Sequence, residues 1–296
     1  MTYEIYSTID AGYTNVSLIM FKSFVEHNPD LRLKVCCINF SPKEYDRYCR
    51  QLSNLKNIEP IPVSFTDSLD HINTGSIDAW GIYQYHMPAT MYKLKLFSEM
   101  TSDYILYLDV DLLIRKSLAP LLKEYTTDFV AHYYETYFTG IGINAGVLIA
   151  RKGMPDLYTK SYDFFKKRKE TKQPEEFYIS HAGYSITELP AKFNYFRFVT
   201  TTEFVKDPYI IHFCSAAKPF NCKNVKNKEL KLGLYYTALN CCFVYFDEWY
   251  TVFDSIADIL DQEFVVQVNQ AREFYKPFIE ISKRCSTKLE RFAKWK

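Results

Sequence analysis

Short apolar runs alternate with longer amphipathic stretches through the first half of this chain. Runs rich in β-branched and aromatic residues predict buried strands, and they lie at residues 3–9, 33–40 and 104–108. Helical patterns follow these runs, at about residues 13–27, from residues 41–42 onward and at 88–100. Because strands that alternate with helices form parallel sheets, the pattern predicts an α/β fold with a mostly parallel central sheet and helices on both faces.

Proline marks the start of two predicted helices and weakens one predicted strand. Pro42 follows Ser41 at the first position of a helix, and Pro88 is expected to begin the helix that ends near Met100. The strand at residues 57–63 contains two prolines. Since proline cannot donate a hydrogen bond to a neighbouring strand, this strand should lie toward an edge of the sheet.

The second half of the chain changes character part of the way along. Further strands are expected at residues 129–133, 143–150 and 208–213, with a basic helix at about residues 156–169. From about Leu230 the sequence turns to helices rich in aromatic residues. We therefore expect a domain at residues 1–228 that is built on the sheet, and a helical, aromatic and basic C-terminal extension at residues 229–296.

Composition narrows the class of protein. The 296 residues carry a formal net charge of +1, and this near-neutral balance argues against nucleic-acid binding. The chain opens on a predicted strand instead of a secretion signal, and no apolar stretch is long enough to cross a bilayer. The eight cysteines include two vicinal pairs but no Cys-x-x-Cys motif, which favours free thiols and a cytoplasmic location.

Two carboxylates at the end of one predicted strand are the strongest indication of chemistry. Asp109 and Asp111 follow the apolar run at 104–108, and because strand side chains alternate, both should point to the same side. Two like charges this close repel each other and favour a divalent cation. The alternative is that both aspartates cap a helix or lie in a solvated turn. The apolar residues Leu112–Ile114 follow directly, and this setting favours the metal site.

Three further segments accompany the two aspartates in order along the chain. They are Ala89-Thr90-Met91-Tyr92-Lys93-Leu94, Asn144-Ala145-Gly146 within an apolar strand, and His212 with Lys218 six residues later. Together with Asp109-Val110-Asp111 these segments resemble the family 8 retaining glycosyltransferases, over roughly residues 3–222. The resemblance implies the GT-A fold and a UDP-sugar donor, usually UDP-glucose or UDP-galactose. It also implies Mn²⁺, with Mg²⁺ as the alternative metal.

The resemblance implies a role for each matching residue. The metal ligands would be Asp109, Asp111 and His212, and an imidazole nitrogen favours Mn²⁺ over Mg²⁺. The remaining matches would contact the donor: Asp10 and Tyr13 at the uridine, Lys93 at phosphate and sugar, Lys218 at the diphosphate, and Asn144, as a catalytic residue, at the sugar. Several of these have plainer alternatives, as a structural histidine or asparagine, a solvated lysine, or a packing tyrosine at the start of a helix.

One motif of the family has no clean match in this chain. The family's Asp-Gln-Asp segment is expected after the basic helix, where only Glu175 and Glu176 follow Pro174. These carboxylates either contact the donor sugar as catalytic residues, or serve as acidic first-turn residues of a helix that Pro174 begins. Both interpretations stay open at this point.

The implied reaction is the transfer of glucose or galactose from a UDP-sugar to a hydroxyl group of a glycan or glycolipid acceptor, with retention at the anomeric carbon. One alternative is an inverting GT-A transferase, in which Glu175 or Glu176 is the base. The other is a non-catalytic protein that binds sugar nucleotides.

The chain printed here ends in a basic segment. Residues 283–296 contain six Lys or Arg residues and one Glu, a pattern typical of a peripheral contact with an anionic membrane. The alternative is a helix that packs on the catalytic domain or forms a homodimer contact, because Leu289, Phe292 and Trp295 recur at every third position.

Overall fold

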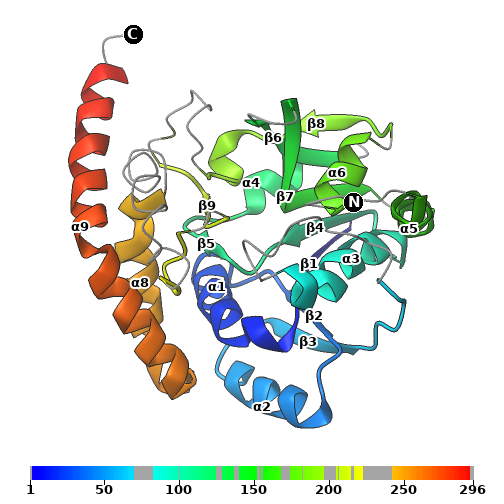
Figure 1. Ribbon diagram of the computed structural model, residues 1–296, viewed down its shortest axis with the longest axis horizontal. Coiled ribbons are helices and arrows are strands. Elements are labelled where there is room, and N and C mark those ends of the chain that lie inside the picture. Colours follow the sequence, from blue (N-terminus) through cyan, green and yellow to red (C-terminus); the bar gives the residue numbers. More distant parts are fainter. Residues whose placement is uncertain are drawn as a thin grey trace.

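A seven-stranded sheet forms the centre of the protein, in the strand order β3-β2-β1-β4-β7-β6-β8 (Figure 1). The structure is a computed structural model. It describes residues 2–69, 83–99, 101–124, 129–136, 140–151, 154, 156–167, 174–181, 183–196, 205, 207–214, 217–222 and 242–293.

The first half of the chain supplies four parallel neighbours in the sheet. They are β1 (Tyr3–Ile9), β2 (Leu33–Ile38), β3 (Ile58–Val63) and β4 (Tyr104–Leu108). β1 pairs in parallel with both β2 and β4, and β2 pairs in parallel with β3. β3 lies at the edge of the sheet, as predicted, because Pro60 and Pro62 have no N–H to donate to a further strand.

The rest of the sheet is partly antiparallel. It consists of β6 (Phe129–Thr136), β7 (Gly140–Arg151) and β8 (Ile186–Glu188). β7 runs antiparallel to both β4 and β6, while β8 pairs with β6 in parallel. The prediction of a mostly parallel sheet is therefore confirmed. The strand β7, which lies between β4 and β6, runs in the opposite direction to both. This reversal places Val147 of β7 opposite Leu108, the last residue of β4.

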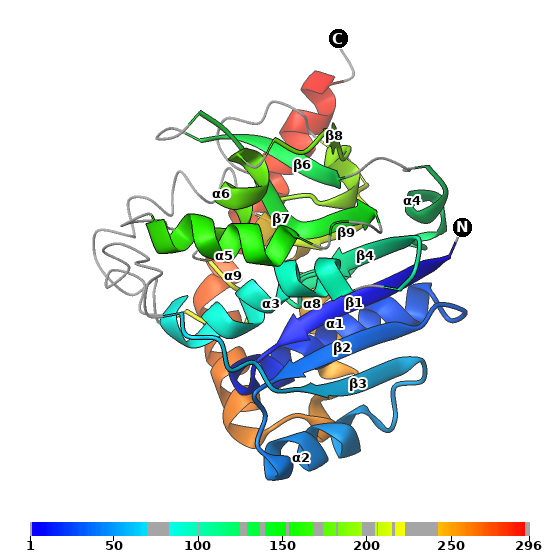
Figure 2. The ribbon, with the colours of Figure 1, turned by 90° about the vertical axis from the view of Figure 1, so that its right-hand side faces the viewer.

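Helices cover both faces of the sheet, as predicted (Figure 2). The described helices before residue 200 are α1 (Thr14–His27), α2 (Pro42–Leu52), α3 (Tyr83–Glu99), α4 (Ala119–Glu124), α5 (Leu157–Lys167) and α6 (Pro174–His181). α1 lies on one face, and α3 and α5 lie on the other. Because side chains alternate along β4, Leu106 and Leu108 join the core on the α1 side, while Ile105 and Tyr107 pack with α3 and α5.

Helix α3 begins earlier than the sequence predicts. Pro88 lies inside α3, so the prediction that Pro88 begins this helix is wrong. Proline removes one hydrogen bond to the carbonyl group four residues earlier. Packing outweighs that loss, because Met91, Leu94 and Phe97 are buried in the core on this face.

The C-terminal extension packs onto the sheet domain. Its elements are the short 3₁₀ helices η5 (Cys242–Tyr245) and η6 (Ala257–Ile259) and the helices α8 (Phe246–Asp254) and α9 (Gln262–Ala293). α9 runs along one side of the molecule beside α8 (Figure 1). Trp249, Phe253 and Tyr275 are buried in the same core cluster as the residues of α1. The predicted domain boundary between residues 228 and 229 lies outside the described residues.

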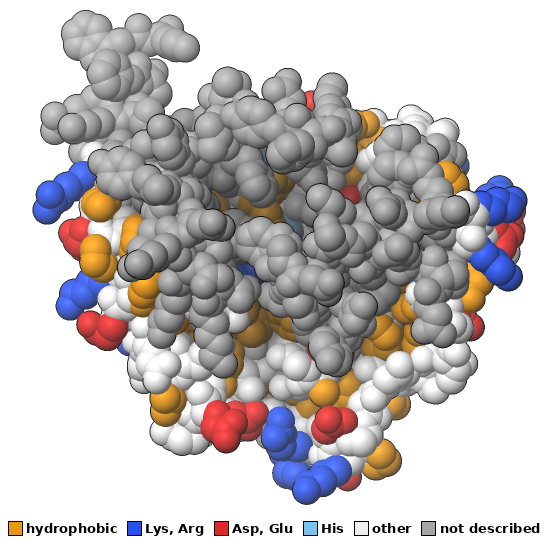
Figure 3. Space-filling model, viewed as in Figure 1, with side chains coloured by type: hydrophobic (Ala, Val, Ile, Leu, Met, Phe, Trp, Pro, Cys, Tyr) orange, Lys and Arg blue, Asp and Glu red, His pale blue; other side chains and the backbone are white. Residues whose placement is uncertain are grey.

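Six cysteines lie within the described residues, and all six are free thiols, as predicted. Within the described residues, every helix is too short or too polar to cross a bilayer. On the face shown in Figure 3, acidic and basic side chains gather along the lower edge, near α2.

Candidate active site

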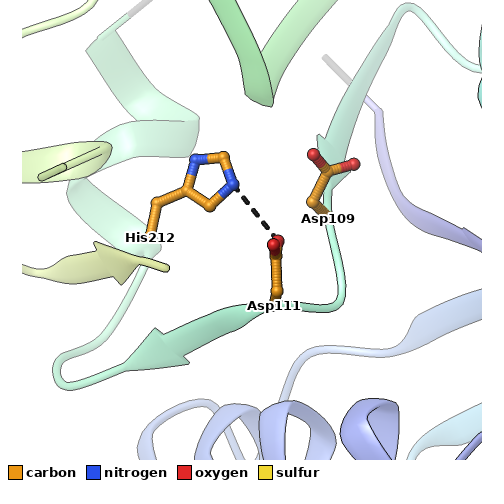
Figure 4. A group of neighbouring side chains, drawn as sticks. All are labelled: Asp109, Asp111 and His212. Atoms are coloured by element: carbon orange, nitrogen blue, oxygen red, sulfur yellow. Dashed lines mark ion pairs between the residues drawn. The ribbon is translucent and has the colours of Figure 1, made fainter. Parts of the chain in front are cut away.

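A short second sheet brings the three candidate metal ligands together. It consists of two antiparallel strands, β5 (Leu112–Ile114) and β9 (Ile210–His212). Asp109 and Asp111 lie between the end of β4 and the start of β5, so the pairing sets His212 beside them (Figure 4). One ligand atom from each of the three side chains lies within 4.8 Å of the others.

The chemistry of this group suits a divalent cation. Carboxylate oxygens are ligands for hard divalent ions, and an imidazole nitrogen extends the choice to transition metals. Three protein ligands also leave coordination positions for a substrate. The structure thus brings together Asp109, Asp111 and His212, the residues that the sequence predicted as ligands.

The carboxylate of Asp111 lies between the imidazole ring of His212 and the ammonium group of Lys218. His212 Nε2 lies 3.2 Å from one carboxylate oxygen, and Lys218 forms an ion pair with the other. Burial alone would raise the pKa of Asp111, but Lys218 and His212 hold it well below its usual value. Burial acts to lower the pKa of Lys218, yet Asp111 and Tyr13 raise it overall. Both members of the pair are therefore charged at neutral pH.

Two asparagines orient the ring of His212. Its Nδ1 lies 3.0 Å from Asn144 Oδ1 and 3.1 Å from Asn194 Oδ1. Asn144 Oδ1 also accepts hydrogen bonds from Gly146 N at 3.0 Å and Asn194 Nδ2 at 2.8 Å. Because an amide oxygen can only accept, Nδ1 of His212 carries the proton and donates it. The Nε2 atom of the ring then faces the two aspartates, in the orientation that a metal ligand needs.

Gly146 makes room for this ring. A Cβ atom at Gly146 would lie 2.2 Å from Cε1 of His212, a contact that no side chain can make without moving the histidine. The carbonyl group of Gly146 also accepts a hydrogen bond of 2.8 Å from Asp109 N. The backbone of Gly146 therefore lies against the ring of His212 and is also hydrogen-bonded to Asp109.

Lys93 lies against the carboxylate of Asp109 and is only 2% exposed. Its Nζ is 3.2 Å from Asp109 Oδ1, donates to Ala145 O at 3.1 Å, and lies 4.4 Å from the centroid of the Tyr107 ring. These contacts compensate the buried charge of the ammonium group. The structure places Lys93 in the site, while its contact with the donor stays a prediction.

Glu176 reaches the same strand from α6. This helix begins at Pro174, as one of the two interpretations required. Glu176 is nevertheless buried, and its Oε1 accepts a hydrogen bond of 3.0 Å from Ala145 N. Its carboxylate therefore lies beside the Asn144–Gly146 segment. Glu175 belongs to α6 as well, but its side chain lies outside the described residues.

Asp10 and Tyr13 lie at the carboxyl end of β1. Asp10 caps the 3₁₀ helix η1 (Ala11–Tyr13), because its Oδ1 accepts a hydrogen bond of 2.8 Å from Gly12 N. The ring of Tyr13 packs edge-on against Phe220, with 6.5 Å between the centroids. Burial raises the pKa of the Tyr13 hydroxyl, and the charge of Lys218 acts in the opposite direction. The predicted uridine contacts of both residues stay predictions.

Sequence reasoning missed Asn194 and the steric role of Gly146. Asn194 is fully buried and follows the 3₁₀ helix η3 (Ala191–Phe193). The backbone of Tyr195 forms hydrogen bonds with Ile210 and His212 of β9. This pairing places the preceding residue, Asn194, beside the histidine ring. A single asparagine after a short helix gives no sequence signal of such a contact, because asparagine is common at helix ends.

Comparison with known proteins extends these observations. The sequence model described as Glycosyl transferase family 8 matches residues 4–185. No curated protein matches this chain. Among solved structures, the galactosyltransferase LgtC in complex with donor and acceptor sugar analogs is similar, with 18% identity and a TM-score of 0.61. That similarity covers 89% of this chain and 99% of LgtC.

A second similar structure is the glycosyltransferase GlyE of Streptococcus pneumoniae TIGR4. It has 18% identity and a TM-score of 0.57, over 91% of this chain and 63% of GlyE. At these identities the two structures support the fold, while the family match spans more than half of the chain. The chain therefore belongs to glycosyl transferase family 8, has the GT-A fold, and is a glycosyltransferase.

Proposed function

We propose that this glycosyltransferase moves glucose or galactose from a UDP-sugar to an acceptor hydroxyl, depends on Mn²⁺, and retains the configuration of the anomeric carbon. The observation that carries the proposal is the group formed by Asp109, Asp111 and His212, with Lys218 paired to Asp111. Three metal ligands beside an ammonium group suit a diphosphate, which can bind a metal ion and a direct cation together.

Mn²⁺ fits this set of ligands better than Mg²⁺ does. Mg²⁺ prefers oxygen ligands, whereas Asn144 and Asn194 hold His212 so that its Nε2 faces the site. Asp109, Asp111 and His212 would hold the ion. When bound, it supplies positive charge next to the oxygens of the departing diphosphate.

Lys218 is placed to stabilise the negative charge that develops on the leaving UDP. Its pKa is raised by Asp111, so the side chain remains an ammonium group. An ammonium group donates strong, charge-assisted hydrogen bonds to phosphate oxygens. Because this charge is greater in the transition state and in free UDP than in the intact donor, Lys218 should affect turnover and UDP affinity most.

The sugar of the donor should lie against residues 144–146 and α6. Asn144 Oδ1 is engaged by Gly146, Asn194 and His212, so its NH₂ group is the one that would donate to a sugar hydroxyl. The carboxylate of Glu176, next to Ala145 N, would accept from another hydroxyl. The donor and acceptor sugar analogs bound to the similar LgtC structure support a site of this kind.

Retention is proposed to proceed by same-face attack, in which the departing phosphate assists the incoming hydroxyl. Glu176 is hydrogen-bonded to Ala145 N, which favours a role in orienting the sugar over one as a covalent nucleophile. NMR of the product anomer tests the stereochemistry, and an inverted product would contradict retention.

The proposed acceptor is a glycan or a glycolipid in the cytoplasm. Residues 283–296 would then form a peripheral membrane contact or a homodimer contact.

A screen of nucleotide sugars tests the proposed function directly. With Mn²⁺, the protein is expected to release UDP from UDP-glucose or UDP-galactose, and EDTA should abolish the release. Asp111→Asn should abolish it as well, because it removes the charge of a metal ligand that also pairs with Lys218. A protein that binds UDP but releases none from any UDP-sugar would be a sugar-nucleotide-binding protein instead.

A further inference from the structure

Lys218 stands at the first position of a tight turn. Asn221 N donates a hydrogen bond of 3.1 Å to Lys218 O, and Pro219 occupies the second position of the turn. Proline at that position has the φ value that the common turn types require. Because Lys218 pairs with Asp111 from this turn, the orientation of the turn decides where the ammonium group lies.

The next three carbonyl groups of the turn accept hydrogen bonds from side chains of the C-terminal helices. The bonds run from the Tyr250 hydroxyl to Pro219 O at 3.1 Å, from Gln267 Nε2 to Phe220 O at 2.7 Å, and from the Tyr275 hydroxyl to Asn221 O at 3.0 Å. Tyr250 belongs to α8, and Gln267 and Tyr275 belong to α9. We call these three donors the turn clamp.

The packed side chain of Phe220 also anchors the turn, in addition to the three hydrogen bonds. Phe220 is 7% exposed and contacts two aromatic rings. Its centroid lies 6.1 Å from that of Trp249 in α8 and 6.5 Å from that of Tyr13 after β1. The turn therefore sits between the start of α1 and the C-terminal extension.

The polar character of the clamp distinguishes it from ordinary packing. Buried carbonyl groups need donors, and most find them in backbone N–H groups or water. Here three successive carbonyl groups, one in a buried and two in partly buried hydrogen bonds, are paired with side chains that lie far along the chain. Since hydrogen bonds are directional, they fix the orientation of each peptide plane, which apolar contact alone does not.

We propose that Tyr250, Gln267 and Tyr275 are positioning residues for the transfer reaction, which hold the turn so that Lys218 meets the diphosphate beside Asp111. This inference rests on the donor site of the proposed function and deepens it, because it gives the C-terminal extension a part in donor binding. A cation that is already in place loses less conformational freedom when the ligand arrives, so it binds the ligand more tightly.

Calorimetry with two nucleotide probes tests the clamp. Gln267→Leu and Tyr250→Phe each remove one donor and keep most of the side chain's shape. Each variant is expected to bind UDP, with Mn²⁺ present, about 3- to 10-fold more weakly, which is the effect of one lost hydrogen bond. Uridine has no diphosphate, so its affinity should change by less than about twofold in the same variants.

Tyr45→Phe is the matched control for these variants. The hydroxyl of Tyr45 donates to Pro60 O at 3.0 Å, the same kind of bond as that of Tyr250, but between α2 and β3. Tyr45→Phe and Tyr250→Phe should lower the thermal unfolding midpoint to a similar degree. Only Tyr250→Phe should weaken the binding of UDP.

A double-mutant cycle shows whether the clamp acts through Lys218. Gln267→Leu should have no further effect on UDP affinity in a Lys218→Ala background. Equal effects of Gln267→Leu in both backgrounds would overturn the inference. The inference would also be overturned if the clamp variants bound UDP as tightly as the wild type while Lys218→Ala bound it more weakly. In that case the proposed function would still stand. A wild-type protein that binds no UDP with Mn²⁺ would overturn the proposed function itself.

Discussion

Asn144 Oδ1 accepts hydrogen bonds from three polar atoms, Gly146 N, Asn194 Nδ2 and His212 Nδ1. The histidine Nδ1 shares its proton between this oxygen and Asn194 Oδ1. Rotation of either asparagine would leave a buried polar group unpaired, at a cost of about 1–3 kcal/mol. At the scale of single residues, the candidate metal ligand His212 is therefore oriented by amides that lie outside the group of Asp109, Asp111 and His212.

Loss of Asn194 should weaken metal binding more than it weakens the fold. Asn194→Ala removes one of the two acceptors of His212 Nδ1, and the loss of such a partner typically lowers metal affinity about 10- to 100-fold. Titration with Mn²⁺ in a calorimeter, without nucleotide, measures the change. Asn28→Ala is the control, because Asn28 is also buried and its Oδ1 accepts from Leu118 N at 2.7 Å, away from the site. Similar Mn²⁺ affinities of the two variants would contradict the role of Asn194.

Gly146→Ala should displace His212. The added Cβ atom would lie 2.2 Å from the imidazole ring, so the ring has to leave its present place beside Asp111. We expect Mn²⁺ affinity to fall by at least about 10-fold, as for the loss of a ligand's supporting contact. Electron paramagnetic resonance of free Mn²⁺ during a titration gives this affinity directly.

Gly183→Ala is an informative partner for that experiment. Gly183 has φ +78° and nothing within 4 Å of an added Cβ atom. Alanine at this position should cost roughly 1–2 kcal/mol in stability through backbone strain, with Mn²⁺ affinity unchanged. If Gly146→Ala behaved in the same way, the contact with His212 would not be what requires glycine there.

At the residue scale, the sequence was sufficient to predict the three side chains that the structure groups together as candidate ligands, but not the residues that orient them. Asp109 and Asp111 could be recognised because two carboxylates end an apolar run, and His212 through its family pattern. The contact of Asn194 with Asn144 joins residues that are 50 positions apart. No local pattern records such a contact, since it depends on how the chain returns to the sheet.

At the scale of elements, two short strands decide where the histidine lies. β5 and β9 have three residues each, which is too few for an alternating pattern to predict their pairing. The apolar pattern predicts a strand at residues 208–213, which contains β9, but no separate strand at residues 112–114. β8 also has three residues and was missed for the same reason. Longer runs were found more accurately, because β1 and β4 have the predicted bounds and β2 begins at the predicted residue but ends two residues earlier, at Ile38.

The packing of α8 on the sheet domain predicts a large loss of stability when its tryptophan is removed. Trp249 is 1% exposed, stacks on Phe253 at 5.9 Å between centroids, and contacts Phe220. Trp249→Ala should lower the free energy of unfolding by about 3–5 kcal/mol, because it removes a large side chain from a packed core. Urea denaturation followed by circular dichroism measures this loss.

Val266→Ala gives the comparison for the same extension. Val266 in α9 is 47% exposed, and surface substitutions of this kind usually change stability by less than about 0.5 kcal/mol. If Trp249→Ala were equally mild, α8 would not contribute to the core as the structure indicates.

At the scale of the whole molecule, one reversed strand brings distant segments to the same end of the sheet. Asp10 and Asp109 follow the carboxyl ends of the parallel strands β1 and β4. β7 runs in the opposite direction, so its Asn144–Gly146 segment reaches this end from within the strand. The strand–helix rhythm of the sequence was sufficient for the parallel half. It could not specify the direction of β7, because that direction depends on which neighbours the strand pairs with.

The binding of UDP should stabilise the sheet domain and the C-terminal extension as one unit. The turn that carries Lys218 is bonded to α8 and α9, and the extension shares a core with α1. We therefore expect a single unfolding transition. UDP at 100 times its dissociation constant, with Mn²⁺ present, should add about 2.7 kcal/mol to the free energy of unfolding.

A single tryptophan can report whether the extension follows the rest of the protein. With Trp80 and Trp295 replaced by Phe, Trp249 is the only tryptophan left, and its fluorescence reports on α8, while circular dichroism reports on all helices and strands together. UDP with Mn²⁺ should move both unfolding midpoints upward by the same amount, and uridine should move them less because it lacks the diphosphate that Lys218 is proposed to contact. A Trp249 midpoint that stays in place while the other rises would show that residues 229–296 unfold independently, and it would contradict the coupling through the turn.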